Sequence, residues 1–135
     1  MNTIDSELVR LAMRIGYAAA WNGLFAEAVT IFRGVSAVRK ESELPLLGIA
    51  VVGFIRNDLD LAEKALDQAL ACNADSDIVQ AHRGCLLRLQ GKEEKGKELL
   101  ASLENSADSD AKALVMKVKN IPTDELFRSS EVGQD

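Results

Sequence analysis

One spacing recurs along this chain of 135 residues and constrains its fold more than any other feature. Gly23, Asn57 and Gly91, all residues that favour turns, follow one another at intervals of 34 residues. Agreement in several registers at one interval indicates an internal repeat in which each copy forms the same supersecondary structure. The same interval relates three sets of chemically matched residues: Gly16, Ala50 and Gly84; Ala28, Ala62 and Gly96; and Phe32, Leu66 and Leu100.

The three matched sets indicate that each repeat is a pair of antiparallel helices. Helix axes approach closely only where side chains are small, so the first set predicts where the first helix of a pair touches the second. The second set supplies the reciprocal gap, and the third, one turn later, fills the space between repeats. From apolar periodicity and turn residues we expect helices at 6–21, 25–37, 43–55, 59–71, 77–89 and 93–104.

These residues carry a resemblance to a known family. Ala28-x3-Phe32 matches the A-x3-F signature of the tetratricopeptide repeat, whose period is also 34 residues. The second and third repeats also carry a small residue followed, four positions later, by a large apolar residue. The resemblance implies an all-α solenoid of three helical hairpins, with coincident spacing of unrelated hairpins as the alternative. The Trp, Leu and Tyr positions of the family's first helix are not kept, and in the third repeat they read Gln80, Arg83 and Leu87.

The repeats predict a single domain over residues 1–120, with repeats at about 9–42, 43–76 and 77–108. Segment 109–119 places its apolar residues on one face and its lysines off that face. This pattern predicts a C-terminal capping helix, which covers the open end of the last repeat. Residues 121–135 are mostly polar, and we expect them to be disordered.

In tetratricopeptide repeats the first helix of each pair lines a concave groove, and its ligand-facing positions recur at the repeat interval. Helix 43–55 is apolar around its whole circumference, which predicts burial on one side by its own repeat and on the other by a ligand. An exposed apolar wall of this extent marks a binding surface, with Arg10 and Arg88 at its edges. The expected partner-binding residues are Met13, Tyr17, Trp21, Leu44, Leu47, Val51, Phe54, Ile55, Ile78, Ala81, Cys85 and Leu89.

Two alternatives leave this groove without a foreign ligand. Residues 121–135 could fold back over it, although only Ile121, Leu126, Phe127 and Val132 offer apolar surface. A second copy of the chain could also close it, because apolar concave faces dimerise when no substrate is present. A homodimer in the absence of substrate is the stronger of the two.

Composition argues against two other classes of partner. A net charge of −5 repels phosphate, so we do not expect nucleic acid binding. The longest apolar run, Leu44 to Ile55, is too short to cross a bilayer, so no membrane association is expected. Residues 1–5 lack the basic start and apolar stretch of a signal peptide. We therefore expect a cytoplasmic protein.

Catalytic and metal-binding patterns are also missing from the sequence. His82 is the single histidine, expected at a surface or edge, and no nucleophile or carboxylate pair accompanies it. Cys72 and Cys85 lack the spacing of metal ligands and are expected to behave as small hydrophobic residues. We expect no enzyme, no cofactor and no metal.

A short, acidic chain of three repeats with an apolar groove resembles the small tetratricopeptide chaperones of bacterial type III secretion. The resemblance covers residues 6–120 and implies a cytoplasmic chaperone that sequesters an amphipathic helix of an aggregation-prone needle or translocator subunit. In the needle class a second small helical co-chaperone covers part of the array. Polar clamp residues for an acidic peptide are missing, since Met13, Tyr17, Ile55 and Ile78 occupy those places. The alternative function is a general tetratricopeptide adaptor in another protein complex.

Overall fold

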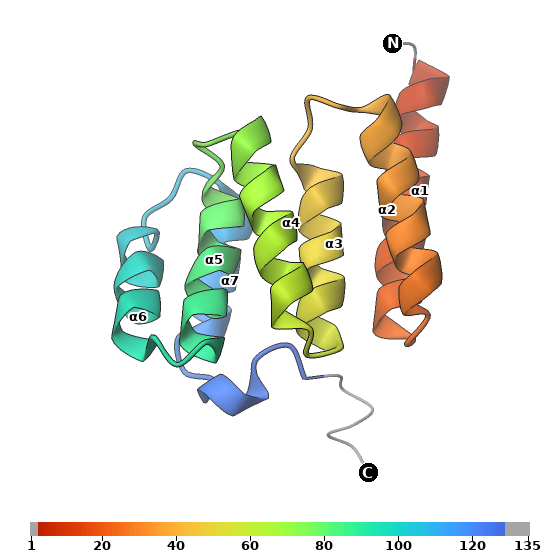
Figure 1. Cartoon of the computed structure of the whole chain (residues 1–135). Helices are drawn as coiled ribbons and strands as arrows, with labels where there is room; N and C mark the ends of the chain where they lie inside the picture. The colour runs from red at the N-terminus through yellow and green to blue at the C-terminus, as the bar shows by residue number, and fades with distance from the viewer. Residues whose placement is uncertain (1–2, 129–135) are drawn as a thin grey trace. The chain divides into compact units, whose positions relative to one another are not determined.

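The computed structural model describes residues 3–128, which contain seven α-helices, one 3-10 helix and no β-strand (Figure 1). The all-α class predicted from the sequence is confirmed for these residues. The chain forms two compact units, residues 1–73 (unit 1) and residues 74–135 (unit 2).

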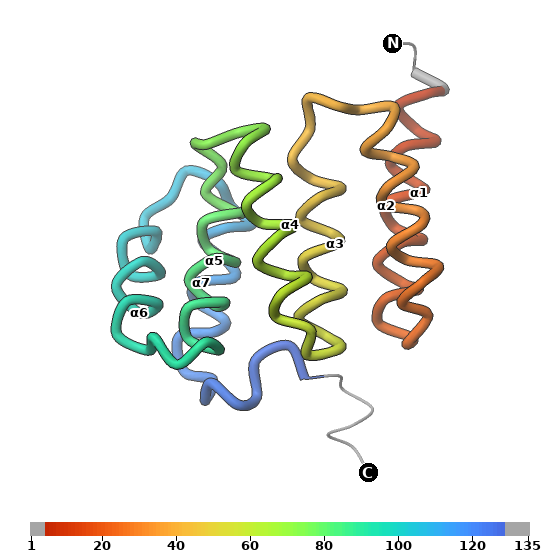
Figure 2. The backbone as a smooth tube through the Cα atoms, in the orientation of Figure 1, coloured from red at the N-terminus to blue at the C-terminus, as the bar shows by residue number. Residues whose placement is uncertain are grey.

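Unit 1 is built from two helical hairpins. Helices α1 (Thr3–Trp21) and α2 (Phe25–Val38) form the first, and α3 (Leu44–Ile55) and α4 (Leu59–Cys72) form the second. The backbone reverses direction after each helix (Figure 2). α3 packs against α1 and α2 as well as against α4, so the second hairpin is stacked on the first.

Unit 2 contains a third hairpin and a C-terminal cover. Helices α5 (Asp77–Leu89) and α6 (Glu93–Ser102) form the hairpin, followed by α7 (Ser109–Val118) and the 3-10 helix η1 (Thr123–Glu125). α5 packs against α6, α7 and η1. A helix, α7, is present where the sequence predicts a capping helix, and it packs against the first helix of the third hairpin.

The 34-residue interval is visible in the three hairpin turns. Gly23, Asn57 and Gly91 all adopt positive φ, at 82°, 58° and 87°, the left-handed conformation that ends a helix. In each turn this residue's N–H donates to the carbonyl three residues earlier, and the next N–H donates to the carbonyl five residues earlier. Glycine adopts this conformation without strain, and asparagine is among the few other residues that tolerate it.

Helix starts are fixed by side-chain caps at three further positions. The Asp58 carboxylate accepts from the Leu61 N–H, and the Ser76 hydroxyl accepts from the Val79 N–H. Asp108 accepts from the N–H groups of Asp110 and Ala111 at the start of α7. Such caps satisfy N–H groups that have no partner within the helix, so they locate α4, α5 and α7 in the sequence.

The small repeat positions are packing sites, as predicted. A Cβ placed on Gly16 would lie 2.7 Å from the Phe32 ring, and one placed on Gly84 would lie 2.7 Å from Cγ of Leu100. These two pairs are related by two repeat intervals. Ala50 and Ala62 are fully buried in the second hairpin.

The C-terminal segment departs from expectation. Residues 123–125 form η1, and the Leu126 side chain is only 6% exposed. The prediction of disorder is thus wrong for residues 121–128, because a few apolar side chains suffice to anchor a short segment on a helix. Residues 129–135, which include Val132, lie outside the described residues.

Candidate protein-binding surface

The twelve residues predicted to bind a partner, here called the inner wall, differ widely in exposure. Eight of them lie in unit 1 on α1 and α3, which pack together, and four lie on α5 in unit 2. Trp21 and Leu44 are exposed, at 39% and 48%. Met13, Tyr17, Ile55, Ile78 and Leu89 are half-buried, and Leu47, Val51, Phe54, Ala81 and Cys85 are buried.

Burial corrects the expectation that α3 needs an external ligand. Residues 47–54 of this apolar helix are all buried, and α3 packs against three other helices of unit 1. The aromatic contact beside it is also internal, because the Tyr17 ring meets the Phe32 ring edge-on at 5.0 Å between centroids. This burial raises the pKa of Tyr17 to about 12. Of the twelve inner-wall residues, Trp21 and Leu44 are therefore the two that are exposed.

In unit 2 the chain itself covers the inner-wall face of α5. Ala81 and Cys85 belong to a core with Val115 and Val118 of α7 and with Leu126. Half-buried apolar residues pack around this core: Leu89, Leu114, Ile121 and Phe127. Burial raises the pKa of the Cys85 thiol to about 12, so the thiol stays protonated. Self-covering by the C-terminal segment, one of the two alternatives for the groove, is thus observed on α5.

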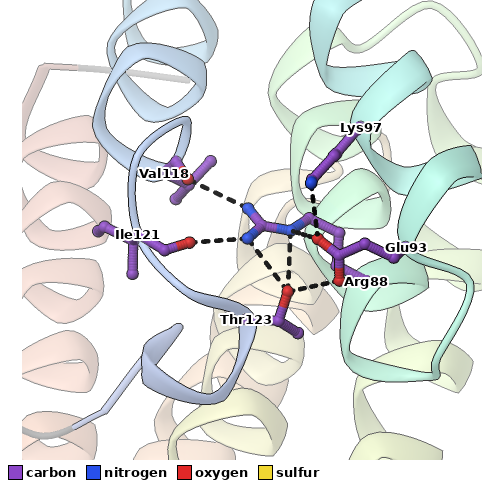
Figure 3. Close-up of polar contacts among 6 residues, drawn as sticks. All are labelled: Arg88, Glu93, Lys97, Val118, Ile121 and Thr123. Carbon is purple, nitrogen blue, oxygen red and sulfur yellow. Dashed lines mark hydrogen bonds and ion pairs between the residues drawn. The ribbon is translucent and has the colours of Figure 1, made fainter.

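Arg88 holds this cover in place. The sequence suggested that it lies at the edge of a groove, and its contacts correct that expectation. Its side chain is 4% exposed. Figure 3 shows its contacts with Glu93, Val118, Ile121 and Thr123. The guanidinium donates from Nη1 to the Val118 carbonyl at 3.1 Å and from Nη2 to the Ile121 carbonyl at 2.7 Å. Nε pairs with the Glu93 carboxylate at 3.0 Å. One planar cation thereby joins α5, the start of α6 and the end of α7.

Thr123 completes the network around Arg88. Its hydroxyl donates to the Glu93 carboxylate at 2.6 Å and accepts from Nη2 of Arg88 at 3.1 Å. The Thr123 hydrogen bond, followed by those of Arg88, lowers the pKa of Glu93. The side chains drawn in Figure 3 contact one another and the backbone of unit 2, and they tie α5, α6 and the segment after α7 together.

His82 is buried, which corrects the prediction of a surface or edge position. Its Nδ1 lies 2.8 Å from the Ile78 carbonyl, which can only accept, so Nδ1 carries the proton. The ring also lies 5.8 Å from the Phe127 ring, measured between centroids. Burial lowers the pKa of His82. Within the described residues, no group of three or more His, Cys, Asp and Glu residues could hold a metal ion.

The exposed apolar surface is concentrated in unit 1. Seven large hydrophobic side chains at least 39% exposed lie between residues 8 and 44, whereas Met116 alone has this character in the described part of unit 2. Beside them, α1 and α2 form an apolar groove of about 340 Å³. Sequence reasoning missed most of this surface, although the spacing of Leu8, Leu11 and Ile15 is that of one helix face. The seven residues are Leu8, Leu11, Ile15, Trp21, Leu24, Val38 and Leu44.

A second cavity, of about 440 Å³, has a different chemistry. Its charged lining residues are Arg33, Lys40 and Lys64, set around the apolar side chains of Leu46 and Leu61. The residues that line this cavity include no Asp or Glu, so its cationic side chains could accept an anionic group.

No described helix is long and apolar enough to span a membrane. Comparison with protein families, with curated proteins and with solved structures finds no match to this chain.

Proposed function

We propose that the protein is a tetratricopeptide-type helical module that binds an amphipathic helix of another protein. The observation that carries the proposal is the exposure of Trp21 and Leu44 on the inner wall of unit 1, whereas the inner-wall face of α5 in unit 2 is covered by its own chain. Large apolar patches that stay exposed on a folded protein mark interaction sites.

The repeat geometry supports the tetratricopeptide assignment. Three hairpin turns at one 34-residue interval share a left-handed residue and the same pair of hydrogen bonds. In such arrays the first helices of successive hairpins lie side by side, as α1 and α3 do in unit 1. Trp21 and Leu44 then stand on the inner side of a short helical array.

A helical ligand suits this surface better than an extended one. The described residues offer no β-strand edge on which a peptide could add a strand. A ligand on an apolar wall must satisfy its own backbone, which a helix does. Trp21, as an exposed aromatic anchor, is expected to contribute about 2 kcal/mol or more to binding.

We further propose a specific role, that of a cytoplasmic chaperone for a needle or translocator subunit of type III secretion. Its support is the small acidic chain and its apolar surface, which would shield a helix that aggregates when free. The needle-class form of this role includes a second small helical co-chaperone. A general adaptor remains the competing role, and it differs in having a folded, soluble partner.

The single tryptophan makes the test direct, because Trp21 lies within the proposed surface. The protein and its Trp21→Ala and Leu44→Glu variants would serve as bait in lysate of the native cell, with captured proteins quantified by mass spectrometry. Met116→Glu is the matched control, since Met116 is also an exposed large apolar residue, at 54%, but lies in unit 2.

The expected result is one protein that is captured by the wild type and by Met116→Glu but is lost with both unit 1 variants. A peptide covering its amphipathic helix should then shift Trp21 emission to shorter wavelength and gain helical circular dichroism. Aggregation of that partner when expressed alone would favour the chaperone over the adaptor. Equal capture by all four proteins would refute binding through this surface.

A further inference from the structure

A second apolar feature of α1 lies away from the inner wall. Leu8, Leu11 and Ile15, here called the outer stripe, are 59%, 49% and 49% exposed. Their spacing places them on one helix face, roughly 150° around α1 from the face of Met13, Tyr17 and Trp21. α1 packs on its neighbours through other residues, among them the buried Gly16, Ala19 and Ala20.

The surface next to the outer stripe is shaped to receive side chains. The 340 Å³ groove adjoins the outer stripe at Leu8, with Leu8, Val9 and Ala12 from α1 opposite Ile31, Gly34 and Val38 from α2. Gly34 has no atom within 4 Å of a Cβ placed on it, so the groove is open there. Side chains from an opposing helix could therefore pack between α1 and α2 in unit 1.

Two opposite charges border the outer stripe on the same edge. Glu7 precedes Leu8 and Arg14 precedes Ile15, so each end of the stripe carries one charge of different sign. Both side chains are exposed, and neither has an ionic or hydrogen-bonding partner among residues 3–128. Arg10 and the inner wall lie further around the helix.

This pattern is complementary to itself. Consider two copies of α1 that run antiparallel. If Leu8 packs against Ile15 of the second copy, the two-fold axis passes between Leu11 and Ala12. The register that pairs Glu7 with Arg14 centres one residue away, so the two registers differ by a slide of two residues, about 3 Å, between the helices. In antiparallel helix pairs, residues on the same edge face each other, so a single arrangement satisfies both the apolar and the charged residues.

We propose that two copies of this chain associate through antiparallel α1 helices, burying the outer stripe and pairing Glu7 with Arg14 of the second copy twice. The two-fold symmetry is what selects a second copy as the occupant. A partner helix of uniform charge would meet a like charge at one end of the stripe, whereas this chain meets an opposite charge at both ends. The surface is separate from the inner wall, so partner binding and self-association use different faces.

Charge reversal with rescue tests the pairing. Glu7→Arg and Arg14→Glu each create two like-charge contacts across the two-fold axis, and the double variant restores two opposite-charge contacts. Glu94→Arg, at an exposed residue of α6, is the control for a change of net charge. Dissociation constants would come from sedimentation equilibrium of the full chain at micromolar concentrations, with circular dichroism to verify that each variant is folded.

Wild type and Glu94→Arg should sediment at twice the chain mass of 14.6 kDa. Each single reversal should raise the dissociation constant about tenfold, and the double variant should recover to within about threefold of wild type. Leu11→Glu should give a folded monomer. A monomeric wild type, or reversals without effect, would overturn the proposal, as would a double variant no better than the single ones.

Discussion

The two units cover the apolar surface of their first helices to different extents. In unit 2 the inner-wall face of α5 is closed by α7 and by residues 121–127, with Ala81 and Cys85 inside a continuous core. In unit 1 the repeat-equivalent residues Met13 and Tyr17 are half-buried and Trp21 is exposed, and the outer stripe on another face of α1 is exposed as well. The inner-wall positions of the first helix are thus more deeply buried in unit 2 than in unit 1. The difference is that only unit 2 adds a covering segment after its hairpin.

One repeat-equivalent position shows how the cover is secured. Ala20, Phe54 and Arg88 occupy the same place in the three repeats, 34 residues apart. The first two are buried apolar residues, whereas Arg88 extends its guanidinium to carbonyls at the end of α7 and beyond it. Arg88, the one residue of the three that departs from the apolar repeat pattern, therefore ties the C-terminal cover to α5.

The largest expected effect breaks the cover at that point. Arg88→Met keeps the length of the side chain but leaves the Val118 and Ile121 carbonyls and the Thr123–Glu93 pair without their donor. We expect a loss of about 3–4 kcal/mol in the free energy of unfolding, measured by urea denaturation followed by circular dichroism. Lys97→Ala removes only the exposed 3.6 Å ion pair to Glu93 and should cost less than about 0.5 kcal/mol. Similar losses in both variants would show that the buried network contributes nothing specific.

A pair of leucine truncations sharpens the contrast between covered and open surface. Leu126→Ala removes a side chain that is 6% exposed, and it should cost about 2–3 kcal/mol. Leu11→Ala removes one that is 49% exposed, and at concentrations where the chain is monomeric it should change stability by less than about 0.5 kcal/mol.

The same truncation should expose the Cys85 thiol. In a Cys72→Ser background, a thiol reagent should modify Cys85 slowly in the otherwise wild-type chain and much faster after Leu126→Ala. Cys72 is the natural comparison, because it is exposed. Unchanged modification of Cys85 would mean that Leu126 does not help to cover it.

Two helical glycines, one in each unit, test the packing between helices. A Cβ on Gly96 would approach the Gly84 carbonyl and Cγ of Arg88 at 2.6 Å, so Gly96→Ala should cost about 1–3 kcal/mol. Gly34 meets no atom within 4 Å, and Gly34→Ala should stabilise α2 by about 0.5–1 kcal/mol. Thermal unfolding of both variants gives the comparison. A stabilised Gly96→Ala would contradict the close approach of α5 and α6.

The smallest expected effect is a pH dependence confined to unit 2. Burial lowers the folded-state pKa of His82 below its usual 6.5, so the unfolded chain binds the proton first as pH falls. Stability from this group is therefore complete above about pH 6.5 and declines on acidification, by at most about 1.4 kcal/mol per pH unit. Urea denaturation at pH 7.5 and 5.5 measures it, with His82→Gln expected to flatten the change. An equal slope in that variant would assign the dependence to the carboxylates.

Local structure was largely predictable from the sequence. All seven helices lie where periodicity, caps and turn residues place them, and five of the twelve ends of the six repeat helices differ from expectation by one to three residues. Asn57 predicts a turn as clearly as Gly23 and Gly91, because all three tolerate positive φ. The small residues of the repeat identify helix contacts, because a missing side chain has the same consequence in every copy.

Tertiary structure alone decided which apolar residues stay exposed. The pattern that marked Ala81, Cys85 and Phe54 as ligand-facing is the same pattern that marks a core, and the structure buries all three. It also gave Arg88 and Leu126 their roles, through contacts with residues about 30 or more positions away in the chain. Helix periodicity depends on neighbours three and four residues apart and can be read from one sequence. Exposure depends on which segments, distant in the chain, pack on a helix face. That is set by the packing of the whole unit.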